Sequence, residues 1–507
     1  MTEKPEPSAQ HVDSLREKVV RGATWMVALR LCDRLFGLAS LFVLARLLVP
    51  EDFGVIALVN ALIGLLGLMG AFGLETALVR SRDAGKPQFD TVFTFRAMFG
   101  LAMALVLAAV AKPAADFYGD PRVTNVVLAL ACARLIGAFE NVGLVYFRKD
   151  LAFDKEFRFV FCKRILVTLA VTLPLAFYLR DYRALVAGTL AGSVVGVALS
   201  YYLHPYRPSF GLPAWRELFG FSKWMLATNL VGFAYSRAAD FIIGRLLGAG
   251  ALGVFSLSKE ISVLPSSELA APMQRAAFSG YARLSGDVVA LRQAYLRVVS
   301  VLSSVVIPAG AGLCLLAAPL VHLFLGDRWL DAIPVVQILA VEGILVVGLS
   351  SAHYIYLTLG TPQKLTSVLA LHAGVSITLM LILIPAHGLV GAATAWIGAS
   401  VVAMPINLGI LSRALQMRGV RIWEATWRPI ISTCIMALSV LVLESVWTPG
   451  ATPIASAAHL AASVALGVAT YAAATTWLWW LAGRPDGPER LVIDRARVLL
   501  PRRAVRW

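Results

Sequence analysis

The sequence predicts an all-α integral membrane protein with about 14 transmembrane helices. Of its 507 residues, 59% are hydrophobic and only 15% are charged. The mean hydropathy of +0.76 is far above that of water-soluble domains. Apolar stretches long enough to cross a hydrocarbon core of about 30 Å as helices recur from Gly22 to Leu481, with short polar breaks. Lipid is therefore the solvent for most of this chain.

Hydropathy and turn residues place the helices in chain order. The first, at 22–48, follows Arg16, Lys18 and Arg21 and is too long for the core of a secretory signal, so we expect it to stay in the membrane. The others lie near 52–80, 91–111, 122–147, 158–179, 182–203, 216–247, 250–282, 293–317, 330–359, 364–384, 388–412, 428–447 and 456–482.

The chain contains an internal repeat. At an offset of 199 residues, the segment from Trp25 to Leu58 is identical to the later segment at 12 of 34 positions, and Arg46 meets Arg245. An even number of helices separates the copies, so the repeat is parallel, and transporters built this way bind substrate between two lobes and alternate access. We predict a tail at 1–21, an N-lobe at 22–203, a C-lobe at 216–412, helices 13 and 14 at 428–482, and a basic tail at 483–507.

Basic residues predict the orientation. Of the 45 Lys and Arg residues, 31 fall in tails and loops on the side of the termini, 5 in the opposite loops and 9 within helices. This asymmetry predicts cytoplasmic termini in a bacterial inner membrane. The net charge of +15 then belongs to the cytoplasmic face and implies no nucleic-acid partner. The seven arginines after Gly483 indicate either binding to anionic lipid headgroups or a solvated charge run.

Several chemistries lack their sequence signals. The five cysteines lie in apolar helices with no C-x-x-C spacing, which predicts buried thiols and no metal site. The chain has no nucleotide-binding P-loop, so we expect no cofactor, and any coupling would use H⁺ or Na⁺. It also has neither the D-x-D motif nor the large extramembrane loop that a membrane glycosyltransferase or polymerase would need. We therefore expect a transporter and not an enzyme.

Charges inside the predicted helices are the candidate site residues. Each costs about 2.5–3.5 kcal/mol at a helix centre, so we expect them to line a wet or paired interior. Arg30, Asp33 and Arg34 fall on one polar stripe of the first helix, and the second copy has no charge at the matching positions. The cations too deep to reach a helix end, and hence candidates for a central anion site, are Arg30, Arg34, Arg134, Arg237 and Lys259.

The acids of the same helices form a second set. They can pair with these cations, as Asp240 does with Arg237 by spacing, or carry protons or sodium. The candidates are Asp33, Glu140, Asp240, Glu260, Glu268 and Glu342. The eighth helix also holds Pro265 and Pro272, each of which removes a backbone hydrogen bond, so we expect a kink that serves either as a moving gate or as a packing feature.

Three segments carry a family resemblance: the opening Ser14–Trp25, the turn Leu44–Gly54 with its Arg-Leu-Leu and Pro-Glu-Asp-Phe-Gly, and Phe72–Arg80. They resemble the Wzx-type polysaccharide flippases of the multidrug/oligosaccharidyl-lipid/polysaccharide exporter superfamily. The resemblance implies flipping of undecaprenyl-pyrophosphate-linked oligosaccharide units from the cytoplasmic to the periplasmic leaflet, for exopolysaccharide, capsule or O-antigen synthesis. It further implies that the buried arginines suit a pyrophosphate, and that polymerase and export components are partners.

Two other functions remain open at this point. A drug/cation antiporter of the same fold would favour acidic over basic cavity residues, and this sequence has both. A non-transporting scaffold of a polysaccharide assembly complex would leave polymer export intact when Arg30 and Arg34 are replaced. The cationic first helix favours an anionic substrate.

Overall fold

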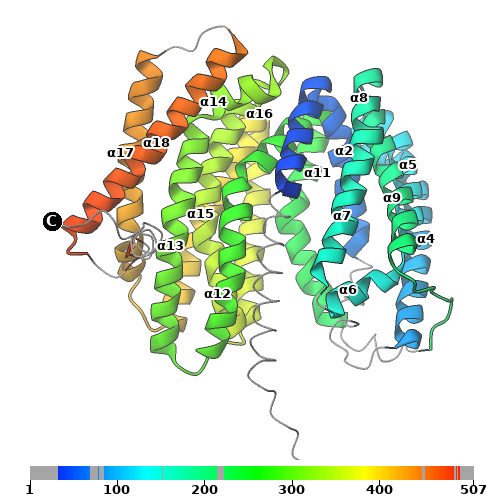
Figure 1. Cartoon of the computed structure of the whole chain (residues 1–507), viewed down its shortest axis with the longest axis horizontal. Helices are drawn as coiled ribbons and strands as arrows, with labels where there is room; N and C mark the ends of the chain where they lie inside the picture. The colour runs from blue at the N-terminus through cyan, green and yellow to red at the C-terminus, as the bar shows by residue number, and fades with distance from the viewer. Residues whose placement is uncertain are drawn as a thin grey trace, which may run out of the picture. The chain divides into compact units, whose positions relative to one another are not determined.

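The computed structural model describes residues 32–68, 78, 85–150, 152–213, 222–447, 452–484, 487 and 489–490. These residues form helices joined by short turns (Figure 1). The predicted tail at 1–21, Arg30 and most of the basic tail at 483–507 lie outside them. The chain divides into two compact units, Met1–Leu230 and Val231–Trp507.

Within the described residues, ten helical stretches are long and apolar enough to cross a membrane, which confirms the all-α membrane class. Two of them, Leu230–Arg283 and Pro362–Ala414, have 54 and 53 residues, enough for two crossings each. Each breaks at a glycine in the left-handed region, Gly248 with φ 83° and Gly388 with φ 55°. A glycine tolerates this backbone at a tight turn because it has no Cβ. The total of fourteen helices stays a prediction.

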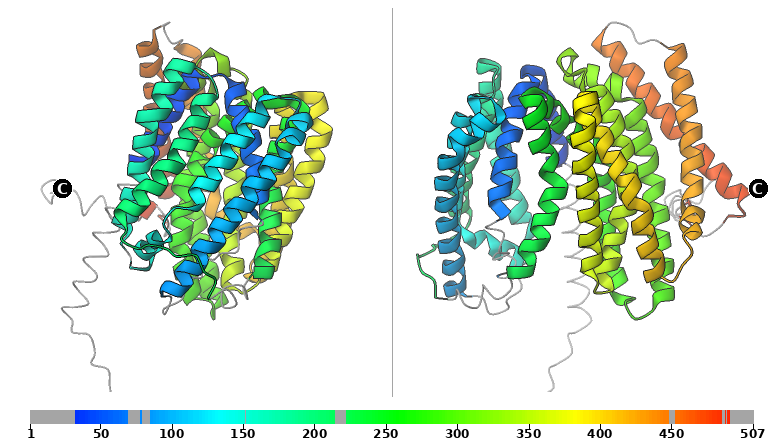
Figure 2. Two further views of the ribbon diagram at one scale, coloured as in Figure 1. Left: turned by 90° about the vertical axis from the view of Figure 1, so that its right-hand side faces the viewer. Right: turned by 180° about the vertical axis from the view of Figure 1, so that it is seen from behind.

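The first unit begins with a helix at 32–47, which we call the first described helix. Its further elements are α2 (Pro50–Gly67), α4 (Lys86–Tyr118), α5 (Arg122–Ala138), η2 (Val142–Leu144), α6 (Val145–Lys149), α7 (Phe153–Val167), the π-helical turn η3 (Thr168–Thr172), α8 (Leu173–Leu179) and α9 (Arg183–Leu203). Helix α5 packs against α4 and α9, and α9 also packs against α7 (Figure 2). The helices α7, η3 and α8 together make one continuous membrane-spanning stretch.

The second unit contains most of α11 (Ser222–Ser262) and the elements that follow it. These are the π-helical turn η4 (Pro265–Ala270), α12 (Ala271–Arg283), α13 (Val288–Leu315), α14 (Ala317–Leu320), η5 (Val321–Leu325), η6 (Asp327–Trp329), α15 (Ala332–Thr358), α16 (Pro362–Ala414), α17 (Val420–Val446) and α18 (Pro453–Leu481). Helix α15 packs against α13 and α16, and α17 packs against α13 and α18. The two arms of α16 lie side by side on either side of Gly388 (Figure 2).

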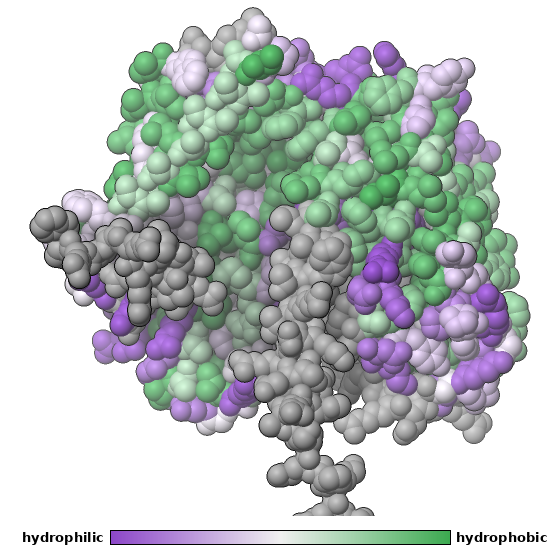
Figure 3. All heavy atoms as spheres, viewed as in Figure 1, coloured by the Kyte–Doolittle hydropathy of each residue, from purple (hydrophilic) through white to green (hydrophobic). Residues whose placement is uncertain are grey.

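The helices present apolar side chains outward. Leu105, Phe177, Ile382 and Leu438 are 62%, 58%, 63% and 65% exposed. In Figure 3 hydrophobic side chains cover most of the visible surface of α8 and α18, and hydrophilic ones gather over α7 and towards the helix ends. Such a surface is stable in lipid, where an apolar side chain gains nothing by turning inward.

The cysteines correct one expectation. Cys32, Cys132, Cys162 and Cys434 are exposed on the helices, so the prediction of buried thiols is wrong for these four. A thiol behaves as a small apolar group, and on a membrane helix the outward face is itself an apolar environment.

A buried carboxylate joins two turns at one end of the first unit. Asp52 is 4% exposed, and its two oxygens accept hydrogen bonds from the Val49 amide at 3.1 Å and the Tyr182 amide at 3.0 Å. It therefore ties the turn before α2 to the turn before α9. In the second copy, Gly248 and Ala251 stand at the positions of Val49 and Asp52, so a glycine turn replaces the carboxylate clamp.

Replacing Asp52 with alanine should destabilise the protein, because two amide donors lose the buried carboxylate that accepts their hydrogen bonds. We expect a loss of about 1–3 kcal/mol, seen as a lower Tm of the detergent-solubilised chain. Glu51→Ala is the matched control, since Glu51 is exposed in the same turn. Equal melting of the two variants would contradict the clamp.

Candidate functional site

An ion pair between helices lies inside the first unit. Arg164 of α7 donates through Nη1 to Asp33 Oδ2 of the first described helix at 2.8 Å. The guanidinium lies against Gly37, in space that a Cβ would occupy, so a larger residue at position 37 would displace the end of the Arg164 side chain. The same two helices make an aromatic contact, in which Phe36 meets Phe161 edge-on with 6.4 Å between the ring centroids. The first described helix is therefore held against α7 by both a polar and an aromatic contact.

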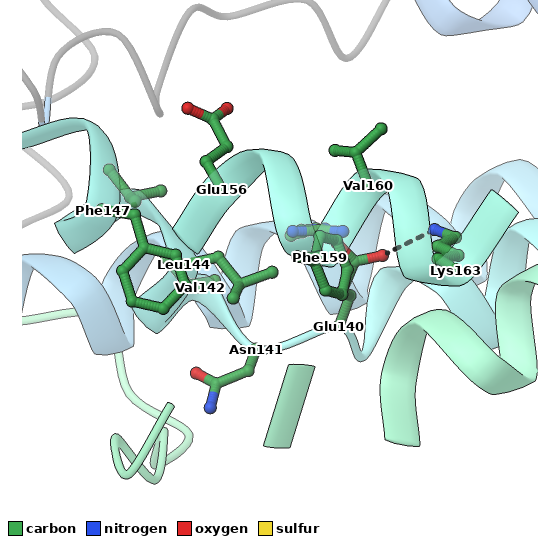
Figure 4. Close-up of a pocket in the computed structure, with 11 residues that line it drawn as sticks. Glu140, Asn141, Val142, Leu144, Phe147, Glu156, Phe159, Val160 and Lys163 are labelled. Carbon is green, nitrogen blue, oxygen red and sulfur yellow. Dashed lines mark hydrogen bonds and ion pairs between the residues drawn. The ribbon is translucent and has the colours of Figure 1, made fainter. Parts of the chain in front are cut away.

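A polar pocket of about 260 Å³ lies between α4, the turn after α5, α6 and α7. In Figure 4, Lys163 and Glu140 point towards each other, and Glu156 points away from them. The Lys163 Nζ lies 3.4 Å from Glu140 Oε2 and 5.5 Å from the centroid of the Phe159 ring. The charged and aromatic residues of the lining are Arg96, Glu140, Phe147, Glu156, Phe159 and Lys163. Cations, carboxylates and aromatic rings thus meet in one cavity.

Close helix packing holds this pocket together. The Lys163–Glu140 pair lies directly on Gly196 of α9, where an added Cβ would come 2.7 Å from Nζ. Arg96 of α4 donates through Nη2 to the carbonyl of Gly137 at 3.0 Å and so reaches across to α5. Each contact joins two different helices, so the pocket depends on the packing of the whole unit.

The loop after α9 closes over the start of α4. Asp90 accepts hydrogen bonds from the Tyr206 hydroxyl at 2.5 Å and from the Ser209 amide at 2.9 Å. The Asn141 side chain, which also lines the pocket, donates to the Tyr206 carbonyl at 2.7 Å. Burial, and then the bond to Asp90, raise the pKa of the Tyr206 phenol, so it remains a hydrogen-bond donor. The loop is therefore anchored on both α4 and the pocket turn.

A second polar cluster lies inside the second unit, around Lys259 of α11. Its Nζ donates to the carbonyl of Ser236 at 3.0 Å and stands 4.4 Å from the centroid of the Trp396 ring. A cation over an indole face is stabilised by the ring quadrupole, most strongly away from water. Nearby on the same helix, Arg237 Nη1 lies 3.1 Å from Asp240 Oδ2. Asp240 is buried, whereas the Arg237 side chain is 47% exposed.

The same unit contains a buried hydrogen-bonded chain. The Ser400 hydroxyl donates to Glu342 Oε1 at 3.3 Å, and His372 Nε2 lies 3.1 Å from that hydroxyl. Glu342, Ser400 and His372 are 6%, 0% and 3% exposed. The Tyr235 ring meets the imidazole edge-on at 4.9 Å. Helices α11, α15 and α16 therefore each contribute to one polar core.

The remaining predicted site residues occupy less enclosed places. Arg34 is half-buried on the first described helix, and Arg134 is exposed on α5. Glu260 and Glu268 are exposed on the eighth predicted helix. In that helix the structure places Pro265 at the first residue of the π-helical turn η4 and Pro272 in the first turn of α12.

Sequence reasoning missed four of the residues that form these clusters. Lys163, Arg164 and Arg96 lie near the ends of predicted helices, where a cation is expected to reach water. His372 carries no formal charge. The available signal was the unpaired acids Asp33 and Glu140, whose partners had to come from other helices.

Comparisons with known proteins agree with a membrane protein of polysaccharide assembly. A family model described as "Polysaccharide biosynthesis protein" matches residues 43–334. The lipopolysaccharide biosynthesis protein WzxC of Escherichia coli is 24% identical over 336 residues, covering 66% of this chain and 68% of WzxC. The succinoglycan biosynthesis transport protein ExoT of Rhizobium meliloti is 26% identical over 338 residues, covering 64% and 67%.

Among solved structures, the lipid II flippase MurJ in an inward closed conformation is similar in fold. It superposes with a TM-score of 0.72 at 11% identity and covers 91% of this chain and 100% of its own. A multidrug transporter of the MATE family in an inward-facing conformation gives 0.57 at 18% identity, covering 77% and 99%. At these identities the likeness concerns the fold alone.

A double-mutant cycle tests the Asp33–Arg164 pair. We expect the effects of Asp33→Asn and Arg164→Gln on the free energy of unfolding to be coupled by about 1 kcal/mol, because each substitution removes the same ion pair between two helices. The exposed pair Asp181–Arg183 is the control and should give a coupling near zero. Additive effects at Asp33 and Arg164 would mean that the contact contributes nothing.

Proposed function

The chain belongs to the polysaccharide biosynthesis protein family, and we propose that it flips a polyprenyl-diphosphate-linked oligosaccharide between the two leaflets. In the finer form of the proposal, the lipid is undecaprenyl diphosphate, the direction is from the cytoplasmic to the periplasmic leaflet, and the mechanism is alternating access. The product would feed exopolysaccharide, capsule or O-antigen synthesis. Two relatives named for lipopolysaccharide biosynthesis and succinoglycan transport, and the fold shared with a lipid II flippase, support this role.

One observation carries the proposal: cations lie inside membrane-spanning helices whose outer surface is apolar. Such a substrate has three parts, and each needs a different environment. The diphosphate needs cationic donors such as Arg34 or Lys259, because charged donors bind phosphate oxygens strongly away from water. The sugars need hydrogen-bonding groups and aromatic faces, which the pocket around Lys163 offers. The lipid tail needs an apolar surface, which the helices present outward.

The acids of the interior argue against a drug/cation antiporter. Asp33 is paired with Arg164, and Asp240 with Arg237. A carboxylate that already has a cation against it is a poor site for a cationic drug, because the drug would have to displace that cation. The likeness to the multidrug transporter therefore extends to the fold and not to its substrate.

Gene deletion and complementation test the proposed function. Without the protein, lipid-linked oligosaccharides should accumulate in the inner leaflet, and the wild-type gene should restore export. Arg34→Ala or Lys259→Gln should restore at most about a tenth of wild-type export, because losing one charge-assisted hydrogen bond costs about 1.5–3 kcal/mol. Measuring the surface polymer and the leaflet distribution of the lipid gives both quantities.

The matched control is Lys112→Gln, which removes an exposed cation near the end of α4. It should restore export fully. Full restoration by both Arg34→Ala and Lys259→Gln would remove the anion site from the proposal. If the wild-type gene restored polymer export without changing the leaflet distribution of the lipid-linked oligosaccharide, the protein would instead be a scaffold.

A further inference from the structure

The chain Glu342–Ser400–His372 contains one proton fewer than it can hold. The Ser400 hydroxyl donates to Glu342, so its oxygen is free to accept from His372, which places the imidazole proton on Nε2. His372 Nδ1 is then a bare acceptor, and it is buried with no hydrogen-bond partner among the described residues. A buried nitrogen without a partner is costly, and a bare imidazole nitrogen has the lone pair that can take up a proton.

A proton that arrives at His372 Nδ1 can reach Glu342 through these three hydrogen-bonded side chains alone. His372 passes its Nε2 proton to Ser400 Oγ, and the hydroxyl proton of Ser400 passes to Glu342 Oε1. The result is a neutral carboxylic acid, an intact hydroxyl and a neutral imidazole protonated at Nδ1. One proton has been taken up, and the carboxylate has lost its charge.

The charged surroundings connect this proton to Lys259. Lys259 and Tyr235, both of α11, lie within electrostatic range of Glu342. Lys259 is also within range of Asp240, Arg237 and Glu260 on its own helix. Trp396, on which Lys259 rests, is one helical turn before Ser400 on α16. The proton chain and the indole beneath Lys259 therefore share helix α16, and α11, which carries Lys259, also places Tyr235 against His372.

We propose that Glu342, Ser400 and His372 form a one-proton site, and that its protonation strengthens binding of a diphosphate at Lys259. When Glu342 is neutral, Lys259 loses a competing negative charge and is more available to an anion. By linkage, anion binding must favour proton uptake by the same factor. The inference rests on the proposed function, because it takes the anion to be that of the substrate. A nitrogen, a hydroxyl and one carboxylate beside a lysine suit a proton better than Na⁺, since hard cations prefer several oxygen ligands.

Calorimetry on the purified full chain in detergent tests the linkage, with farnesyl diphosphate as the probe. Titrations in two buffers of different ionisation enthalpy give the number of protons taken up per probe bound. We expect the wild type to take up a proton, and its Kd to rise with pH by up to about tenfold per pH unit, the limit for one linked proton. Glu342→Gln, which mimics the protonated acid, should bind farnesyl diphosphate at least as tightly as the wild type does. Its Kd should change with pH only as far as the probe itself titrates. Titration of the diphosphate itself is common to both proteins and cancels in their difference.

Glu424→Gln is the control, because Glu424 is an exposed acid of α17, and it should behave as the wild type. Proton release on binding, or uptake that persists unchanged in Glu342→Gln, would overturn the linkage. The linkage would also be overturned if the Kd of farnesyl diphosphate depended on the Na⁺ concentration and this dependence were the same at every pH.

Infrared difference spectroscopy separates this inference from the proposed function, since it needs no substrate. A pH change should produce a protonated-carboxyl band in the wild type that is missing in Glu342→Gln, even if farnesyl diphosphate does not bind at all. After a pH jump, Ser400→Ala should acquire the band more slowly, because the relaying hydroxyl is gone. The same band in Glu342→Gln would refute the site, and an unchanged rate in Ser400→Ala would refute the relay.

Discussion

A charged side chain inside a bilayer must find its partner within the protein, and this constraint organises both units. No water is present in the hydrocarbon core to solvate a lone charge, and several charges of the described helices are paired, placed over an aromatic ring or held in a polar pocket. In the first unit, Asp33 and Glu140 recruit Arg164 and Lys163 from α7. In the second unit, Lys259 takes a backbone carbonyl and an indole face. The polar contacts thereby decide which helices meet, and they also leave cations available for an anionic ligand.

The two copies of the sequence repeat differ in the side chains that make their helix contacts and turns. Phe36 and Tyr235 stand at matching positions of the two copies, and Phe36 meets Phe161 of the fifth predicted helix whereas Tyr235 meets His372 of the eleventh. The aromatic contact between the first and fifth helices of each copy is kept, but it is apolar in one and polar in the other. The turns differ likewise, with a carboxylate clamp at Asp52 in the first copy and a left-handed glycine in the second. The fold tolerates such changes because each is local to its own unit.

Sequence alone was sufficient for the class of the fold, because hydropathy identifies apolar stretches long enough to cross a membrane. It also suggested the pair Arg237–Asp240, whose partners are three residues apart on one helix. It could not find Arg164 as the partner of Asp33, since 131 residues separate them and only packing brings them together. Helix α17 begins at Val420 and not at the predicted 428, because its first turns are polar and hydropathy detects only the part that lies in lipid.

The central claim is that interior cations carry the diphosphate of a lipid-linked oligosaccharide. The most direct measurement is flipping of a fluorescent undecaprenyl-diphosphate oligosaccharide by the purified chain in lipid vesicles, detected with a quencher that cannot cross the membrane. We expect the wild type to expose lipid from the inner leaflet and Lys259→Gln to do so much more slowly. Absence of flipping by the wild type, or undiminished flipping by the variant, would contradict it.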